Sequence, residues 1–288
     1  MKTLNTYMDR AWEDLSADDG WWKAILALGL ANCLPIIGQV IMFGYLFDWA
    51  KEVAWGMNTP LSRKLSELGR CVKYGFLGLW VMLIWIVPVV VIGLLLGLIP
   101  YAGGVICFLV EVFAVVVACI SAVGAFRSII YERVQPGLQV RRVLRMARYD
   151  AGGLAQVTTI ILLLLPLLVA ALFVVLLPTL PFINVIGDVA RGGLLGTDLI
   201  PLALLGMVTI VVALVVWIAG AIVSAFICTL YMRSLGYWME QFKPAEWKTP
   251  ADPMAFELEM AAKKEAKREA KKAAKDKKKS KKQDKKGE

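Results

Sequence analysis

Hydrophobic positions along the chain gather into five apolar runs that are separated by polar segments. Four runs cover residues 75–100, 102–126, 154–180 and 200–230. Each exceeds the about 20 apolar residues that a helix needs to cross roughly 30 Å of hydrocarbon. The runs lack the alternation of barrel strands, and a helix satisfies its own backbone hydrogen bonds in lipid. The pattern therefore predicts an all-α, polytopic transmembrane helical bundle with four full spans.

The fifth apolar run, residues 24–47, is interrupted near its centre by Pro35 and Gly38. Its two arms have 11 and 12 residues, or about 16 to 18 Å each as helices, so neither arm spans a bilayer alone. One interpretation is a re-entrant hairpin with both ends in the cytoplasm, whose turn is buried against other helices. The alternative is a fifth span kinked at the proline, which would place the N-terminus outside.

A repeated sequence pattern favours the hairpin. The motif P-x-x-G-x-V-I-x-F begins at Pro35 and again at Pro100, and a looser version contains Pro181. The second and third copies connect apolar runs that are predicted to be antiparallel helices. We therefore predict membrane turns at three places, with the following turn residues: Pro35, Gly38, Pro100, Gly103 and Pro181.

Basic residues set the predicted orientation. Residues 127–150 contain six arginines, and residues 48–74 contain five basic side chains, whereas the turn after Pro100 has no charge. By the positive-inside rule the basic segments face the cytoplasm. We expect a multi-pass protein of the bacterial cytoplasmic (plasma) membrane with a cytoplasmic C-terminus.

Polar and apolar positions also predict segments at the membrane surface. Residues 1–20 form an amphipathic interfacial helix, residues 21–240 the transmembrane helical domain, and residues 241–288 a cytoplasmic lysine-rich tail that is helical and then disordered. Within residues 127–150 one helical face carries arginine and the other aliphatic side chains, which suits an interfacial helix on anionic lipid. The predicted lipid-surface basic residues are Arg141, Arg142, Arg145 and Arg148. The alternative is that these arginines only enforce topology.

The net charge of +9 lies entirely in the tail, because residues 263–288 contain 14 Lys and Arg against 5 Asp and Glu. The predicted partners are the lipid bilayer and its anionic lipids, each lysine near the surface contributing about 1 kcal/mol. A cytoplasmic protein or ribosome partner, bound through residues 255–288, is a second hypothesis. A solvated, solubilising tail is the third, and no DNA partner is expected.

The sequence contains little material for catalysis. Histidine is absent, the five cysteines have no paired spacing, and no phosphate-binding or nucleophile motif occurs. We expect no enzyme activity, no cofactor and no metal. Glu111 is the charged residue inside the four long runs, and it is either a structural hydrogen-bonding group or part of a proton or cation pathway.

An internal echo suggests duplication of a helical pair. Two apolar runs end in related sequences, Arg127-Ser-Ile-Ile-Tyr131 and Arg233-Ser-Leu-Gly-Tyr237. Repeated helical pairs are a common way to build membrane folds. Chance similarity between apolar sequences is the alternative.

Residues 18–61 carry an acidic and aromatic entry (Asp19, Trp21, Trp22), a Leu-Pro-x-x-Gly break and Gly44-Tyr45. In these features the chain resembles the prokaryotic membrane family called domain of unknown function 4013. Its Ser62-Arg63-Lys64 and lysine tail depart from that family. The resemblance implies a related fold but no biochemical mechanism. We expect a non-enzymatic scaffold or assembly protein with a cytoplasmic basic surface; the alternative is a small transporter or permease-like subunit that uses Glu111.

Overall fold

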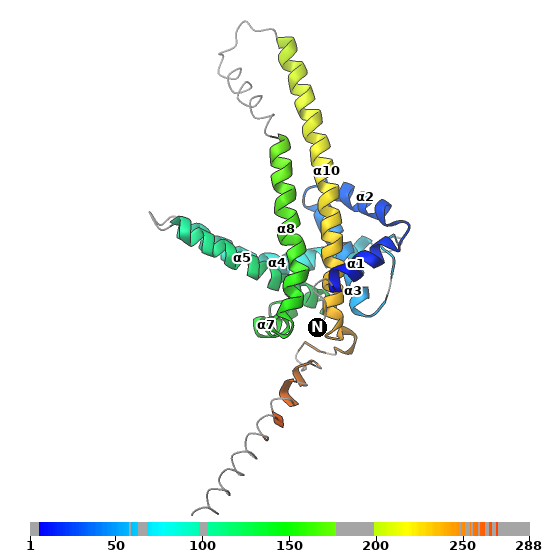
Figure 1. The fold of residues 1–288 in the computed structure, drawn as a ribbon, viewed down its shortest axis with the longest axis vertical. Coiled ribbons are helices and arrows are strands. Elements are labelled where there is room, and N and C mark those ends of the chain that lie inside the picture. The colour runs from blue at the N-terminus through cyan, green and yellow to red at the C-terminus, as the bar shows by residue number, and fades with distance from the viewer. Residues whose placement is uncertain are drawn as a thin grey trace, which may run out of the picture.

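The computed structural model describes residues 6–57, 59–62, 68–97, 103–176, 199–247 and 249–250, with residues 254, 256–258, 260–262, 265–266 and 269 of the tail. Most of these residues are helical, and there is no strand among them (Figure 1). The principal helices are α1 (Thr6–Ser16), α2 (Trp21–Asn32), α3 (Ile37–Ala54), α4 (Leu68–Gly97), α5 (Gly103–Tyr131), α6 (Val134–Gly137), α7 (Val140–Tyr149), α8 (Ala151–Leu176) and α10 (Leu199–Glu240), followed by the short helix η2 (Pro244–Glu246).

The proline-broken run forms two helices joined by a turn. Pro35 lies between α2 and α3, and Ile36 adopts a left-handed φ of 65° that reverses the chain. At the opposite end, the Asp18 carboxylate accepts hydrogen bonds from Ser62 N (2.8 Å) and Ser62 Oγ (2.7 Å). The chain therefore enters α2 and leaves α3 at the same end. This arrangement is a hairpin, not one kinked helix.

Glycines at two helix contacts allow backbones to touch. A Cβ atom at Gly38 would lie 1.6 Å from the carbonyl oxygen of Ala31, which is why the turn closes tightly. Where α3 crosses α4, a Cβ atom at Gly44 would lie 1.7 Å from Cys71 O. A Cβ atom at Gly75 would lie 1.8 Å from Val40 O. The α3–α4 crossing thus requires glycine on both helices.

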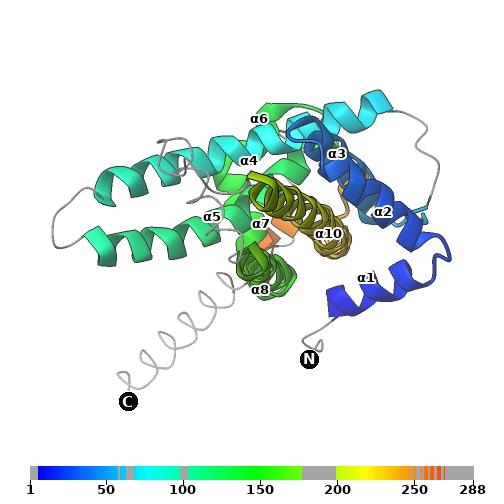
Figure 2. The ribbon, with the colours of Figure 1, turned by 90° about the horizontal axis from the view of Figure 1, so that it is seen from above.

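The long helices pair as α4 with α5 and as α8 with α10. These two pairs extend in different directions, so that α4 and α5 lie across the direction of α8 and α10 (Figures 1 and 2). Among the described residues two helices, α4 and residues 207–240 of α10, are long and apolar enough to cross a membrane. The predicted single bundle of four spans is therefore not confirmed. Apolar patterning gives the length of a helix but not the direction in which its neighbours pack against it.

One end of the molecule is tightly packed, and we call it the hub. It consists of the buried side chains where α1, α3, α5, α7 and α10 meet, including Leu15, Trp49, Phe126, Met146 and Trp238. Away from the hub, α4 and α10 expose large apolar side chains, for example Leu94 (69% exposed) and Ile210 (67%). The fold thus divides into a packed hub and apolar helical arms.

Candidate functional site

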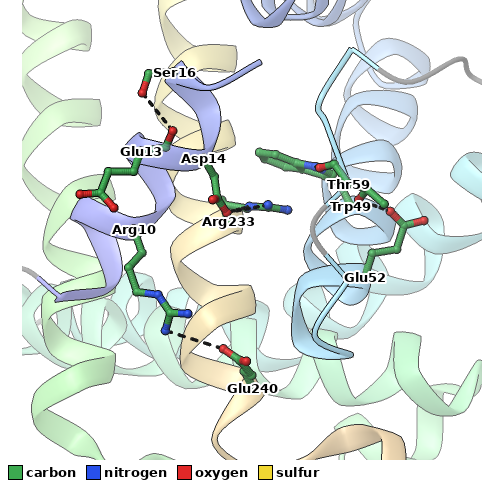
Figure 3. A network of polar contacts seen from close by, with 9 residues as sticks. All are labelled: Arg10, Glu13, Asp14, Ser16, Trp49, Glu52, Thr59, Arg233 and Glu240. Atoms are coloured by element: carbon green, nitrogen blue, oxygen red, sulfur yellow. Dashed lines mark hydrogen bonds and ion pairs between the residues drawn. The ribbon is translucent and has the colours of Figure 1, made fainter.

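A buried ion pair fastens α1 to α10 in the hub (Figure 3). The Arg233 side chain is 1% exposed, and its Nη2 donates to Asp14 Oδ2 at 2.7 Å. Its guanidinium carbon lies 4.3 Å from the centroid of the Trp49 ring. Because a buried guanidinium needs a counter-charge, Asp14 and the aromatic face together keep Arg233 in the core.

A second, exposed contact joins the same two helices. Arg10 lies 4.4 Å over the Tyr237 ring and 3.8 Å from the Glu240 carboxylate. Beside it is a polar cavity of about 230 Å³. Its lining comes from α1, α3, α10 and the segment after α3, and comprises Arg10, Glu13, Asp14, Val53, Gly56, Met57, Tyr237 and Glu240. Three acidic side chains and one arginine line this cavity, so its charged lining is mainly acidic.

Asp150, between α7 and α8, ties three parts of the chain together. Its Oδ2 accepts hydrogen bonds from Tyr7 Oη (3.1 Å) and Gln241 Nε2 (3.2 Å). Its Oδ1 accepts from Gly153 N (3.0 Å). Burial and the adjacent Asp150 carboxylate raise the pKa of Tyr7 to about 12. The Tyr7 hydroxyl therefore stays protonated near neutral pH and keeps its donor.

Arg127, at the end of α5, is buried as deeply as Arg233 but lacks a comparable ion pair. It is fully buried, and its Nη2 donates to Gln139 Oε1 at 3.2 Å. Its guanidinium lies 5.9 Å from the ring centroids of both Tyr131 and Trp247. In the described part of the chain, its Nε and Nη1 atoms have no hydrogen-bond partner. Arg127 is thus a buried cation whose Nε and Nη1 groups do not donate a hydrogen bond to any described residue.

The arginine helix α7 differs from the prediction in what its apolar face contacts. Val143, Met146 and Ala147 are buried in the hub, so most of the aliphatic face packs on protein. Of the predicted basic residues, Arg142 donates to Pro250 O at 2.5 Å, and Arg145 pairs with Glu257 at 2.5 Å. Arg141 and Arg148 are exposed.

Several described residues between 242 and 258 pack on the hub, although the sequence assigned them to the tail. The Trp247 ring stacks on Tyr131 with centroids 5.9 Å apart. Phe256 is 4% exposed and contacts the rings of Tyr149 (5.1 Å) and Phe242 (5.2 Å). The first part of the predicted tail therefore contributes described aromatic side chains to the hub. The aromatic residues ahead of the lysine-rich sequence were the available signal.

A further polar cluster lies between α3, α4 and the end of α5. Tyr74 Oη donates to Glu132 Oε1 (2.8 Å), and Lys73 pairs with the same carboxylate. These donors lower the pKa of Glu132 below its ordinary value. Lys51 Nζ donates to Tyr74 Oη at 3.0 Å. The cluster links the α2–α3 hairpin to the α4–α5 pair.

The other predicted site residues are only partly covered. Gly38 lies in the first turn of α3 and Gly103 begins α5. Pro100 and Pro181 lie outside the described residues, as does the side chain of Glu111. Within the described residues, no group of three or more Cys, Asp or Glu side chains could hold a metal ion.

Neither a comparison with curated proteins nor a comparison with solved structures found a match. A family model described as "Protein of unknown function (DUF4013)" matches residues 27–182, from α2 to beyond α8. The matched region includes Arg127, Gln139 and all four arginines of α7, whereas Asp14 and Arg233 lie outside it. Because the match covers more than half of the chain, the protein belongs to this family of unknown function.

Proposed function

We propose that this protein is a non-enzymatic multi-pass membrane scaffold whose hub lies at the cytoplasmic face of the bacterial plasma membrane. The apolar arms anchor it in the bilayer. Its working surface consists of the exposed arginines of α7 and the lysine-rich tail, which contact anionic lipid and a cytoplasmic partner.

The observation that carries this proposal is the division of the fold into hub and arms. Phe76, Leu94 and Ile210 are more than half exposed on long helices, and many of their neighbours are exposed as well. Apolar surface of this extent marks contact with a membrane or another protein. The ion pairs Arg10–Glu240, Asp14–Arg233 and Arg145–Glu257 lie instead in and around the hub, as expected at a membrane interface.

Insertion of both helical pairs into one membrane would require a change in their relative orientation. The α4–α5 pair and the α8–α10 pair point in different directions from the hub. A single flat bilayer takes both pairs only if one turns relative to the other. The α3–α4 crossing at Gly44 and Gly75 is the contact about which the α4–α5 pair would turn.

The working surface is continuous in sequence with the hub. Arg145 binds Glu257, so the start of the tail is held beside α7. The lysine-rich sequence follows this segment in the chain. The transporter alternative depends on Glu111, and no described contact favours it.

Deletion of residues 271–288 tests the tail without touching any described residue. The deletion removes ten lysines and three acidic residues. Full-length protein held in phosphatidylcholine nanodiscs is expected to bind vesicles containing phosphatidylglycerol, and the deletion should weaken this binding by more than tenfold at low salt. Vesicle flotation measures the bound fraction.

A tail of equal length with its lysines replaced by glutamine is the matched control. It should bind as weakly as the deletion, because charge and not length supplies the attraction. Equal binding by all three proteins would refute the proposed working surface. Strong binding to pure phosphatidylcholine vesicles would also contradict it.

A further inference from the structure

The two Arg-Ser sequences form related but unequal sites in the hub. Arg127 and Arg233 are both buried, each lies over the ring of the tyrosine four residues later, and each faces a tryptophan from another segment. For Arg233 that tryptophan is Trp49, and for Arg127 it is Trp247. The difference is the counter-charge, because Asp14 forms an ion pair with Arg233, whereas no described carboxylate forms one with Arg127.

No described carboxylate takes the place of Asp14 at Arg127. Glu257 acts electrostatically on Arg127, but it is already engaged. Its Oε1 binds Arg145 at 2.5 Å, and its Oε2 accepts from Met254 N at 3.2 Å. A buried guanidinium in this state is costly unless another negative group joins it.

The surroundings of Arg127 favour an anion. Gln139, which accepts from Arg127 Nη2, immediately precedes α7, so the guanidinium lies at the positive end of a ten-residue helix. Arg142, in the first turn of α7, adds a second positive charge that acts on Arg127. A buried cation with free donors, a helix N-terminus and a neighbouring arginine thus come together.

We propose that Arg127 and Arg142, beside the start of α7, form a binding site for a phosphate-type oxyanion. The anion occupies the position at Arg127 that Asp14 occupies at Arg233. Its source is either the phosphate of a phospholipid headgroup or free phosphate. Because Arg127 is fully buried, the bound anion would be enclosed in the hub. The site goes beyond the scaffold function and does not depend on it.

Thermal unfolding of the full-length protein in a non-ionic detergent and a phosphate-free buffer tests this site. The probes are inorganic phosphate, short-chain phosphatidic acid and, as a neutral-headgroup comparison, short-chain phosphatidylcholine. At about 100-fold excess over Kd, a bound anion should raise Tm by roughly 5 °C. Native mass spectrometry should show the anion retained after gel filtration.

Whether the wild type or the Arg127→Gln variant is the more stable protein should depend on phosphate. Without phosphate it should be at least as stable as the wild type, because it removes an unpaired buried charge. With phosphate or phosphatidic acid it should gain nothing and fall below the wild type. Arg142→Gln, which alters a half-buried side chain, should retain the fold and respond only weakly.

Arg233→Gln is the matched control, because its arginine already has an internal counter-ion. This variant should lose stability under all conditions but keep the full response to phosphate. A response to inorganic phosphate identifies free phosphate as a sufficient ligand, and a response to phosphatidic acid alone identifies the lipid headgroup. No response to either probe, or an equal response in Arg127→Gln, would overturn the site.

Discussion

The Asp14→Ala variant is expected to lose about 3 to 5 kcal/mol of unfolding free energy. The substitution removes the carboxylate that binds Arg233, whose side chain is 1% exposed and cannot reach water without disrupting α10 packing. A buried charge then remains over the rings of Trp49 and Tyr237 without the carboxylate that neutralises it. Unfolding of the purified protein in detergent, followed by tryptophan fluorescence, measures the change.

The exposed pair on the same two helices is the control. Arg10 and Glu240 are 51% and 41% exposed and lie 3.8 Å apart, so Arg10→Gln should cost at most about 1 kcal/mol. Adding Arg233→Met to Asp14→Ala should recover much of the lost stability, because the double variant leaves no unpaired charge. Equal losses in Asp14→Ala and Arg10→Gln would contradict the role given to the buried pair.

Gly75→Ala is expected to disrupt the α3–α4 crossing and to cost about 3 kcal/mol or more. The added Cβ atom would lie 1.8 Å from Val40 O, which is backbone and cannot rotate away. The two helices must therefore separate, and the Lys51–Tyr74 hydrogen bond that joins them would be strained. Thermal unfolding in detergent measures the loss.

Gly69, in the first turn of the same helix, supplies the comparison. A Cβ atom at Gly69 has nothing within 4 Å. Gly69→Ala should therefore be neutral or stabilise the protein by up to about 1 kcal/mol, through the better helix propensity of alanine. Similar destabilisation by both substitutions would mean that α3 and α4 do not touch at Gly75.

Several features of the fold were predictable because they depend on short stretches of sequence. The break at Pro35 and Gly38 predicted a chain reversal, and the structure places Pro35 in the turn between α2 and α3. The sequences beginning at Arg127 and Arg233 resemble each other, and both arginines are buried. Helix length and the all-helical class follow from apolar runs in the same way.

Other features depend on contacts between distant residues, which local patterns do not contain. Asp14 and Arg233 are 219 positions apart, and the sequence around each residue gives no sign that the two side chains form an ion pair. The charged composition after residue 241 led to its interpretation as a tail, although Trp247 and Phe256 in this segment pack on the hub. The direction of the α4–α5 pair is set by packing at Gly44 and Gly75, whereas periodicity reports only which face of a helix is apolar.

The position of the hub at one membrane face is tested most directly by cysteine accessibility in intact cells. Single cysteines at Ser16, in α1, and Arg141, in α7, are introduced after replacement of the five native cysteines. Thr197, between the apolar runs 154–180 and 200–230 and opposite the predicted cytoplasmic segments, serves as the external control. An impermeant maleimide is expected to label Thr197→Cys in intact cells, and Ser16→Cys and Arg141→Cys only after lysis. Labelling of Ser16→Cys in intact cells would place α1 outside and contradict a hub gathered at the cytoplasmic face.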